Sequence, residues 1–88
     1  MKLTIVKTFV LSYKKLYVLV VDHHEFEKFA GNKRIFHDEL KVNMLIHSFE
    51  IVNLSNEKSA IGITINYQSQ NQLDLLESLK VGDHIYVE

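Results

Sequence analysis

The chain has 88 residues, no cysteine and a formal net charge of −1. This length accommodates one small domain, and the lack of cysteine excludes disulfides, thiolate catalysis and cysteine-ligated metal sites. Ten basic and eleven acidic residues create no overall field that would attract nucleic acid or an anionic membrane. The longest apolar run, residues 16–21, is too short to cross a bilayer. We therefore expect a single domain over residues 1–88, in the cytoplasm and without a membrane contact.

Two strands and a turn are expected at the start of the chain. Apolar residues recur in period two on one face of residues 2–11, interrupted only at Lys7: Leu3, Ile5, Phe9 and Leu11. Residues 12–15 turn the chain, and residues 16–21 are apolar on both faces, which is typical of a strand covered on both sides. The two strands indicate a β-hairpin.

Residues 22–36 leave two structures open. Asp22 and Glu25 have the spacing of a capping box, and Gly31 suits the end of a helix, so one or two helical turns are expected. An irregular strand is the alternative. In either case a short strand, residues 33–36, follows and ends at a turn.

A long strand is expected over residues 39–53. Its apolar residues have even numbers as far as Ile46 but odd numbers at Phe49 and Ile51, so its inward face slips by one residue. Such a slip requires a β-bulge, which we place at residues 47–48. A bulge bends a strand and allows a sheet to curl.

The last third of the chain contains two strands and one helix. Residues 59–67 alternate between isoleucine and small or polar residues, which predicts a strand. Ser69 and Gln72 have capping-box spacing at the start of a short helix, about residues 70–79, whose buried face carries leucine at every third position. A Gly-Asp turn then leads into a closing strand, residues 84–88.

Four short motifs occur in order along nearly the whole chain: Gly31-Asn32, Phe49-Glu50, Ile61-Gly62-Ile63 and Gly82-Asp83. Their order resembles that of the second domain of translational GTPases of the elongation factor Tu kind. Asn32 replaces the usual aspartate, and the glycines expected around the second strand are missing. The resemblance implies an all-β fold, a small closed barrel of six or seven strands with one short helix, which the final strand seals. The chain lacks the GxxxxGK[ST] motif, so GTP hydrolysis is not implied.

Neither a metal site nor a catalytic site is expected. Histidines that could serve as ligands are His23, His24, His37 and His47, but we interpret them as exposed loop residues, with His47 at the bulge. Ser48 and Glu50 lie close to His47 in sequence, yet neighbours on a strand point to alternate faces and no glycine-rich elbow accompanies them. We therefore expect a protein that is not an enzyme and holds no cofactor.

Two segments interleave cations with aromatic residues, a combination that neutralises phosphates and stacks bases on single-stranded nucleic acid. The residues concerned are Tyr13, Lys14, Lys15, Tyr17, Lys33 and Arg34. Acidic residues lie nearby in the sequence, and a solvated hairpin turn would have the same composition. An RNA- or ribosome-associated module that uses this basic-aromatic surface is therefore one hypothesis.

Phe26, Phe29 and Phe36 lie close together in an otherwise charged segment. They either cap the mouth of the barrel or form an exposed patch for a partner, and capping is the commoner arrangement. As a patch they favour a stand-alone, non-enzymatic binding or adaptor module that contacts another protein. The partner is then a different protein or a second copy of the chain, with the RNA-associated module as the alternative.

Overall fold

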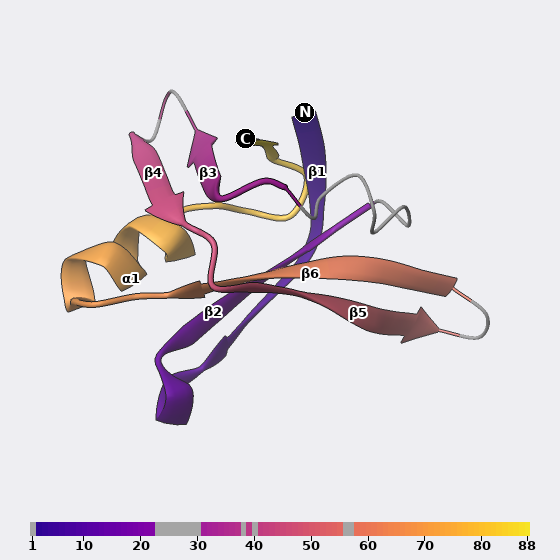
Figure 1. Ribbon diagram of the computed structural model, residues 1–88, viewed down its shortest axis with the longest axis horizontal. Helices are drawn as coiled ribbons and strands as arrows, with labels where there is room; N and C mark the ends of the chain where they lie inside the picture. Colours follow the sequence, from indigo (N-terminus) through magenta and orange to yellow (C-terminus); the bar gives the residue numbers. More distant parts are fainter. Residues whose placement is uncertain (1, 23–30, 38, 40, 56–57) are drawn as a thin grey trace.

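The computed structural model describes residues 2–22, 31–37, 39, 41–55 and 58–88. Seven strands form one antiparallel sheet in the order β4-β3-β7-β1-β2-β6-β5 (Figure 1). The strands are β1 (Lys2–Leu11), β2 (Leu16–Val21), β3 (Arg34–His37), β4 (Val42–Leu45), β5 (Ser48–Ser55), β6 (Lys58–Asn66) and β7 (His84–Val87). The helices are η1 (Ser12–Lys14) and α1 (Gln70–Glu77). Over these residues, no helix has the length and apolar character needed to traverse a bilayer.

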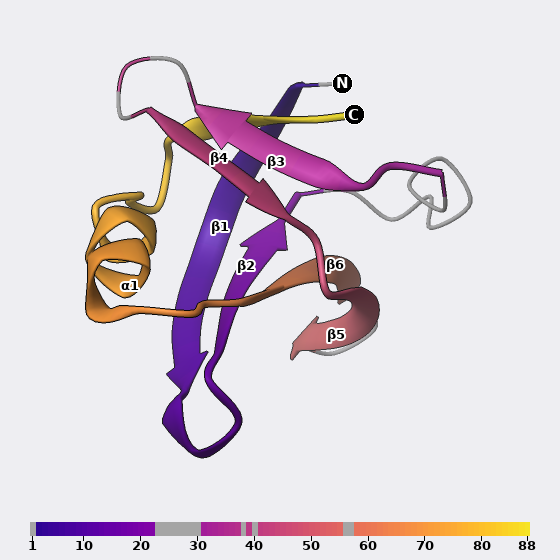
Figure 2. The ribbon, with the colours of Figure 1, turned by 60° about the vertical axis from the view of Figure 1, so that its left-hand side comes forward.

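The all-β prediction with one short α-helix is confirmed, but the closed barrel is wrong. The two edge strands of the sheet, β4 and β5, are separated in sequence only by Ile46 and His47. β4 pairs with β3 and β5 pairs with β6, and among the described residues no pairing joins β4 to β6. The curled sheet therefore has a seam between β4 and β6, which Figure 2 shows from the side.

The linker between the edge strands holds the two sides of the seam together. The N–H of Ile46 donates to the carbonyl of Lys33 at 2.8 Å, and the N–H of His47 donates to the carbonyl of Thr64 at 2.7 Å. The first bond reaches the residue before β3, and the second reaches β6. The seam is thus crossed by the linker, although it is not closed by a strand ladder.

The strand expected over residues 39–53 is divided in two at the predicted place. Ser48 is the register partner of Thr64, while His47 also donates its N–H to Thr64. Two residues opposite one is the arrangement of a β-bulge, which sharpens the bend of the chain. The bend directs β4 and β5 to different neighbours, so the same feature that curls the sheet also prevents one continuous strand. Phe49 packs against the core as expected.

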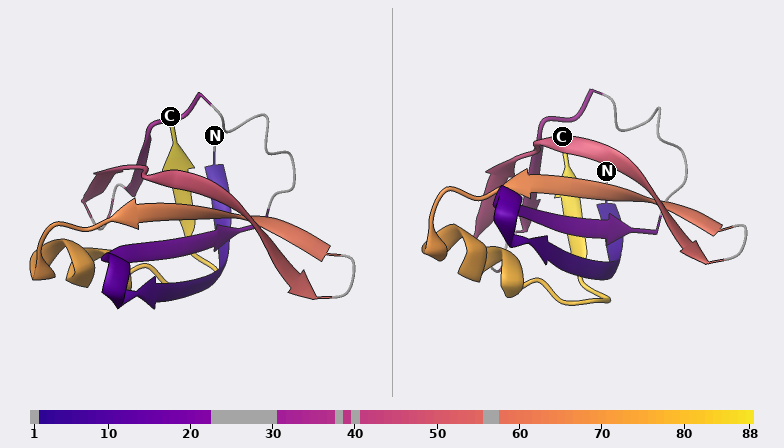
Figure 3. Two further views of the ribbon diagram at one scale, coloured as in Figure 1. Left: turned by 60° about the horizontal axis from the view of Figure 1, so that its bottom comes forward. Right: turned by 90° about the horizontal axis from the view of Figure 1, so that it is seen from below.

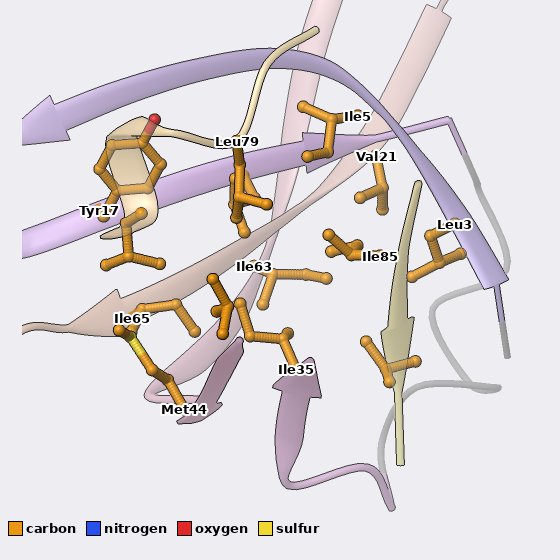
Figure 4. Packing of buried hydrophobic residues seen from close by; sticks show 14 of the residues in the cluster. Leu3, Ile5, Tyr17, Val21, Ile35, Met44, Ile63, Ile65, Leu79 and Ile85 are labelled. Carbon is orange, nitrogen blue, oxygen red and sulfur yellow. The ribbon is translucent and has the colours of Figure 1, made fainter. Parts of the chain in front are cut away.

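The main core lies on the inner face of the curled sheet and contains side chains from the strands and from the region of α1. Figure 4 shows residues from β1, β2, β3, β4, β6 and β7 converging on this interior together with Leu79, which follows α1. Nine of the buried side chains with less than 2% exposure are isoleucine or leucine: Ile5, Leu19, Ile35, Ile61, Ile63, Ile65, Leu76, Leu79 and Ile85. Burial of each contributes roughly 1.5 to 3 kcal/mol to folding before the entropy cost is subtracted.

A second, smaller cluster lies on the opposite face of β2, which confirms that this strand is covered on both sides. Its buried members are Val18, Val20 and Ala60. The pairing of β1 with β2 shifts between Ile5 and Lys7, and beyond this irregularity Phe9 pairs with Val18 while Leu11 packs against the second cluster. The expectation that Phe9 and Leu11 share a face with Ile5 is therefore wrong. The physical reason is a change of parity at the point where Lys7 interrupts the alternation.

The helix begins where its capping signal predicts. The hydroxyl of Ser69 accepts a hydrogen bond from the N–H of Gln72 at 3.2 Å, and Leu76 is fully buried. The helix ends at Glu77, earlier than expected, but Leu79 beyond it still reaches the core. Figure 3 shows α1 beside the β1–β2 hairpin and β7 behind it.

The closing strand occupies the middle of the sheet. Gly82 has a φ of 96°, a left-handed conformation that favours glycine, and it turns the chain into β7. β7 pairs with β1 on one side and with β3 on the other. The expectation of a paired closing strand is confirmed, but β7 joins two halves of the sheet and does not seal a barrel.

Candidate functional site

The first predicted basic-aromatic segment lies at the tip of the β1–β2 hairpin. Tyr13 is 78% exposed, and the Nζ of Lys14 is 5.6 Å from the centroid of its ring. Lys15 is exposed and has a φ of 53°, which closes the turn after η1. Tyr17 is only 3% exposed and belongs to the main core, so its expected place on a binding surface is corrected. It faces inward because it alternates with Val18 on a strand buried on both faces.

The second segment lies at the other end of the molecule. Lys33 precedes β3, and Arg34 and Phe36 belong to it. In Figures 1 and 2, β3 and η1 lie at opposite ends of the ribbon. The structure therefore does not unite the two segments into one basic-aromatic surface. Phe26 and Phe29 lie outside the described residues.

The described residues considered for metal binding and catalysis lie in β3, in the linker before β5 and in β5 itself. His37 ends β3 and His47 lies in the linker, whereas His23 and His24 fall outside the described residues. Within the described ranges, no three His, Asp or Glu side chains gather as a metal site would require. The hydroxyl of Ser48 donates to Glu50 at 3.2 Å and lies 2.6 Å from the hydroxyl of Thr64. The contact with Thr64 holds the start of β5 against β6, whereas the bond to Glu50 lies within β5.

Phe36 and Tyr86 form a stacked pair on the outer face of the sheet, and we refer to them as the aromatic pair. Their ring centroids are 5.4 Å apart and their planes differ by 17°. They are register partners on β3 and β7, and both are partly exposed. The residues before them, Ile35 and Ile85, are fully buried, so the two rings point away from the core. Phe36 therefore does not cap the core.

Tyr86 was not among the residues predicted to bind. Its signal in the sequence is faint: each member of the pair follows an isoleucine in a short strand that begins after a glycine turn. That similarity indicates two rings on the outer face of two strands. It does not indicate that the strands are neighbours, because strand order in a sheet is a tertiary property.

Each ring of the aromatic pair borders a hollow of mixed charge. The hollow beside Phe36, about 520 Å³, is also lined by Lys41, Asn43 and Glu88. The hollow beside Tyr86, about 330 Å³, is lined by basic and acidic residues alike, among them Lys2, Glu39, Asp83 and His84. The register explains this arrangement, since Asn43 pairs with Phe36 and Lys2 pairs with Tyr86. The aromatic pair is thus an apolar centre with a polar rim.

A further pocket of about 440 Å³ lies at the seam, and we refer to it as the seam pocket. It is lined from several elements, including Arg34 of β3, Asn43 and Met44 of β4, His47 of the linker, Ile65 of β6 and Gln72 of α1. The Nε of Arg34 donates to the Oδ1 of Asn43 at 2.7 Å. None of the described residues that line it is acidic. The seam pocket exists because β4 and β6 approach without pairing.

Comparison with known proteins leaves the fold and these surfaces as the basis for inferring function. No protein-family model matches the chain, and neither the curated proteins nor the solved structures include a significant match.

Proposed function

We propose that this protein is a non-enzymatic binding module that contacts another protein through the aromatic pair. The observation that carries the proposal is the stack of Phe36 on Tyr86, partly exposed on an outer sheet face and bordered by two hollows. Aromatic anchors in the centre of a polar rim are typical of interface hot spots, and hollows beside them receive side chains of a partner. The rigid strands beneath the rings hold them in place before binding, which reduces the entropy cost of association.

The charges around the aromatic pair favour a protein over RNA. Lys2 and Lys41 are the lysines of the two hollows, but Glu88 lies in one and Glu39 and Asp83 in the other. Phosphate recognition depends on an excess of cations, because the released counterions drive binding. Balanced charges suit the polar rim of a protein interface. An RNA- or ribosome-associated module is the alternative, supported by the exposed Tyr13 and Lys14 at the hairpin tip.

The test compares two aromatic positions at opposite ends of the molecule. Phe36→Ala and Tyr13→Ala are each used to capture partners from native lysate, with and without nuclease. Loss of a hot-spot anchor costs about 2 kcal/mol or more, roughly a 30-fold loss of affinity. We expect Phe36→Ala to lose the main partner and Tyr13→Ala to retain it.

The same experiment distinguishes the protein-binding module from the alternative, an RNA-associated module. Retained capture by Phe36→Ala, at an unchanged melting temperature, would contradict the proposed interface. Capture that is lost with Tyr13→Ala, abolished by nuclease and steeply weakened by salt would support the RNA-associated module. A cytoplasmic location and the resemblance to the second domain of translational GTPases stay predictions from the sequence.

A further inference from the structure

The seam pocket has the size of a small-molecule site. Its volume, about 440 Å³, lies within the range of roughly 300 to 1,000 Å³ that such sites occupy. Its walls come from β3, β4, the linker, β6 and the start of α1, so five parts of the fold converge on it. It lies on a different part of the sheet from the two hollows that border the aromatic pair, sharing only Asn43 with the nearer one.

The apolar part of the seam pocket belongs to the core. Ile65 is 1% exposed and Met44 is 8% exposed, and partly buried Ile46 packs against the same cluster. These three side chains are held by their neighbours in the main core (Figure 4 labels two of them). Met44 and Ile65 form the buried floor of the seam pocket, while partly exposed Ile46 and exposed Leu45 supply accessible apolar surface for the body of a ligand.

The side-chain amides of the seam pocket are fixed by hydrogen bonds to the backbone and, in one case, to each other. The Nδ2 of Asn66 donates to the carbonyl of Lys15 at 3.1 Å, and the Oδ1 of Asn66 accepts from the Nε2 of Gln68. The Oε1 of Gln72 accepts from the N–H of Gln68 at 2.7 Å. These bonds use the oxygen of Gln72 and leave its Nε2 group as a donor at the wall of the pocket.

The seam pocket contains one permanently charged side chain among its described lining residues, the cation Arg34. The bond from the Nε of Arg34 to Asn43 sets the plane of the guanidinium, whose two terminal nitrogens are the donors that a further acceptor would use. His47 also lines the pocket, and no acidic residue lies among the described lining residues. A planar guanidinium with two parallel donors matches the two oxygens of a carboxylate.

We propose that the seam pocket binds a small organic carboxylate with an apolar body. The carboxylate accepts hydrogen bonds from the terminal nitrogens of Arg34, with Gln72 as a further donor. The apolar body lies against Met44, Ile46 and Ile65. Phe36 and Tyr86 do not line the seam pocket, although Asn43 borders both the pocket and the hollow beside Phe36.

The probe is 3-phenylpropionate, titrated into isotopically labelled full-length protein and followed by amide NMR. Its uncharged analogue, 3-phenylpropanamide, tests the need for the charge, and inorganic phosphate tests the need for the apolar body. We expect 3-phenylpropionate to shift the amides of Leu45, Ile46, His47 and Gln68, and both controls to bind at least about tenfold more weakly, a difference of about 1.4 kcal/mol.

Two variants on neighbouring residues identify the cation. Arg34→Gln removes the guanidinium, and we expect it to weaken 3-phenylpropionate by about tenfold or more. Lys33→Gln removes an exposed cation that does not line the seam pocket, and we expect less than about a twofold change. Asn43→Ala keeps the charge of Arg34 but removes the hydrogen bond that orients its guanidinium. We therefore expect a loss of affinity between those of the other two variants. A well-dispersed amide spectrum confirms that each variant is folded.

The proposal is overturned by any of four results. These are no saturable shift up to about 10 mM probe, shifts outside the pocket, equal binding of the amide analogue or of phosphate, and an equal loss with Lys33→Gln and Arg34→Gln. If Arg34→Gln does not fold, Asn43→Ala becomes the test. An unchanged affinity of Asn43→Ala for 3-phenylpropionate would then also overturn the proposal.

Discussion

At Gly62, β6 packs closely against side chains of both neighbouring strands. A Cβ atom there would lie 2.9 Å from the Cγ2 of Val52 and 3.2 Å from the Cγ1 of Val18. Both contacts fall in the second cluster, where Val18 and Val52 pack on the face opposite the main core. The glycine therefore permits close packing between strands.

The first prediction concerns this contact. Gly62→Ala should lower the free energy of unfolding by about 1 to 3 kcal/mol, because Val18 and Val52 must move to admit a methyl group. Gly31→Ala is the control, since no atom of the described residues lies within 4 Å of its added Cβ and its change should stay within about 0.5 kcal/mol. Urea denaturation of both variants measures the difference. Equal changes in the free energy of unfolding of the two variants would show that close packing at Gly62 does not cause the loss of stability.

The second prediction concerns the cap of α1. Ser69→Ala removes the oxygen that accepts the N–H of Gln72, and we expect a loss of about 1 kcal/mol. Asn71→Ala, at an exposed position in the first turn of the helix, provides the control and should not lower stability comparably. Thermal unfolding followed by circular dichroism compares the two. A Ser69→Ala variant as stable as the wild type would argue against a capping role.

At the scale of an element, β5 is a strand with a neighbour on one side only. Ile51 pairs with Ile61 of β6, yet Ile51 is 68% exposed while Ile61 is 2% exposed. The alternation of apolar residues predicted an inward Ile51, and this prediction is wrong. Ile61 is covered by β2 and β5 on both sides, whereas Ile51 lies at the sheet edge, where no described strand covers it.

The third prediction compares Ile51 with its register partner Ile61. Ile51→Lys should change the free energy of unfolding by no more than about 0.5 kcal/mol, because the ammonium group remains in water. It should also reduce aggregation, since lysine on an edge strand opposes edge-to-edge pairing. Ile61→Lys places the same charge in the core and should prevent folding. Light scattering and thermal melts measure both. A strongly destabilised Ile51→Lys would show that the β5 edge is covered in solution.

At the scale of the whole molecule, β7 connects the two parts of the sheet. β3 and β4 are joined to the remaining strands through β7, which pairs with β3 and β1. Ile85 and Val87 are 0% and 2% exposed and belong to the main core. The fourth prediction is that removal of residues 84–88 unfolds the protein, because both ladders and both side chains are lost. A well-dispersed amide NMR spectrum of the shortened chain would contradict it.

The sequence by itself determined the features that depend on near neighbours. Alternation identified the hairpin and the strand that became β6, the Ser69 signal located the start of α1, and the glycine turn located β7. The change of parity located the bend at residues 47–48. These features were predictable because strand period, helix capping and turn conformation are set by residues only a few positions apart.

Only the tertiary structure decided which strands become neighbours, and the candidate sites depend on that. The stack of Phe36 on Tyr86 requires β3 to lie beside β7, and the seam pocket requires β4 to pass β6 without pairing. The single parity change gave no indication of whether the bent sheet would close. Closure depends on the relative direction of β4 and β5 after the bend, and that direction is set by packing against the whole core, to which residues distant in sequence contribute together.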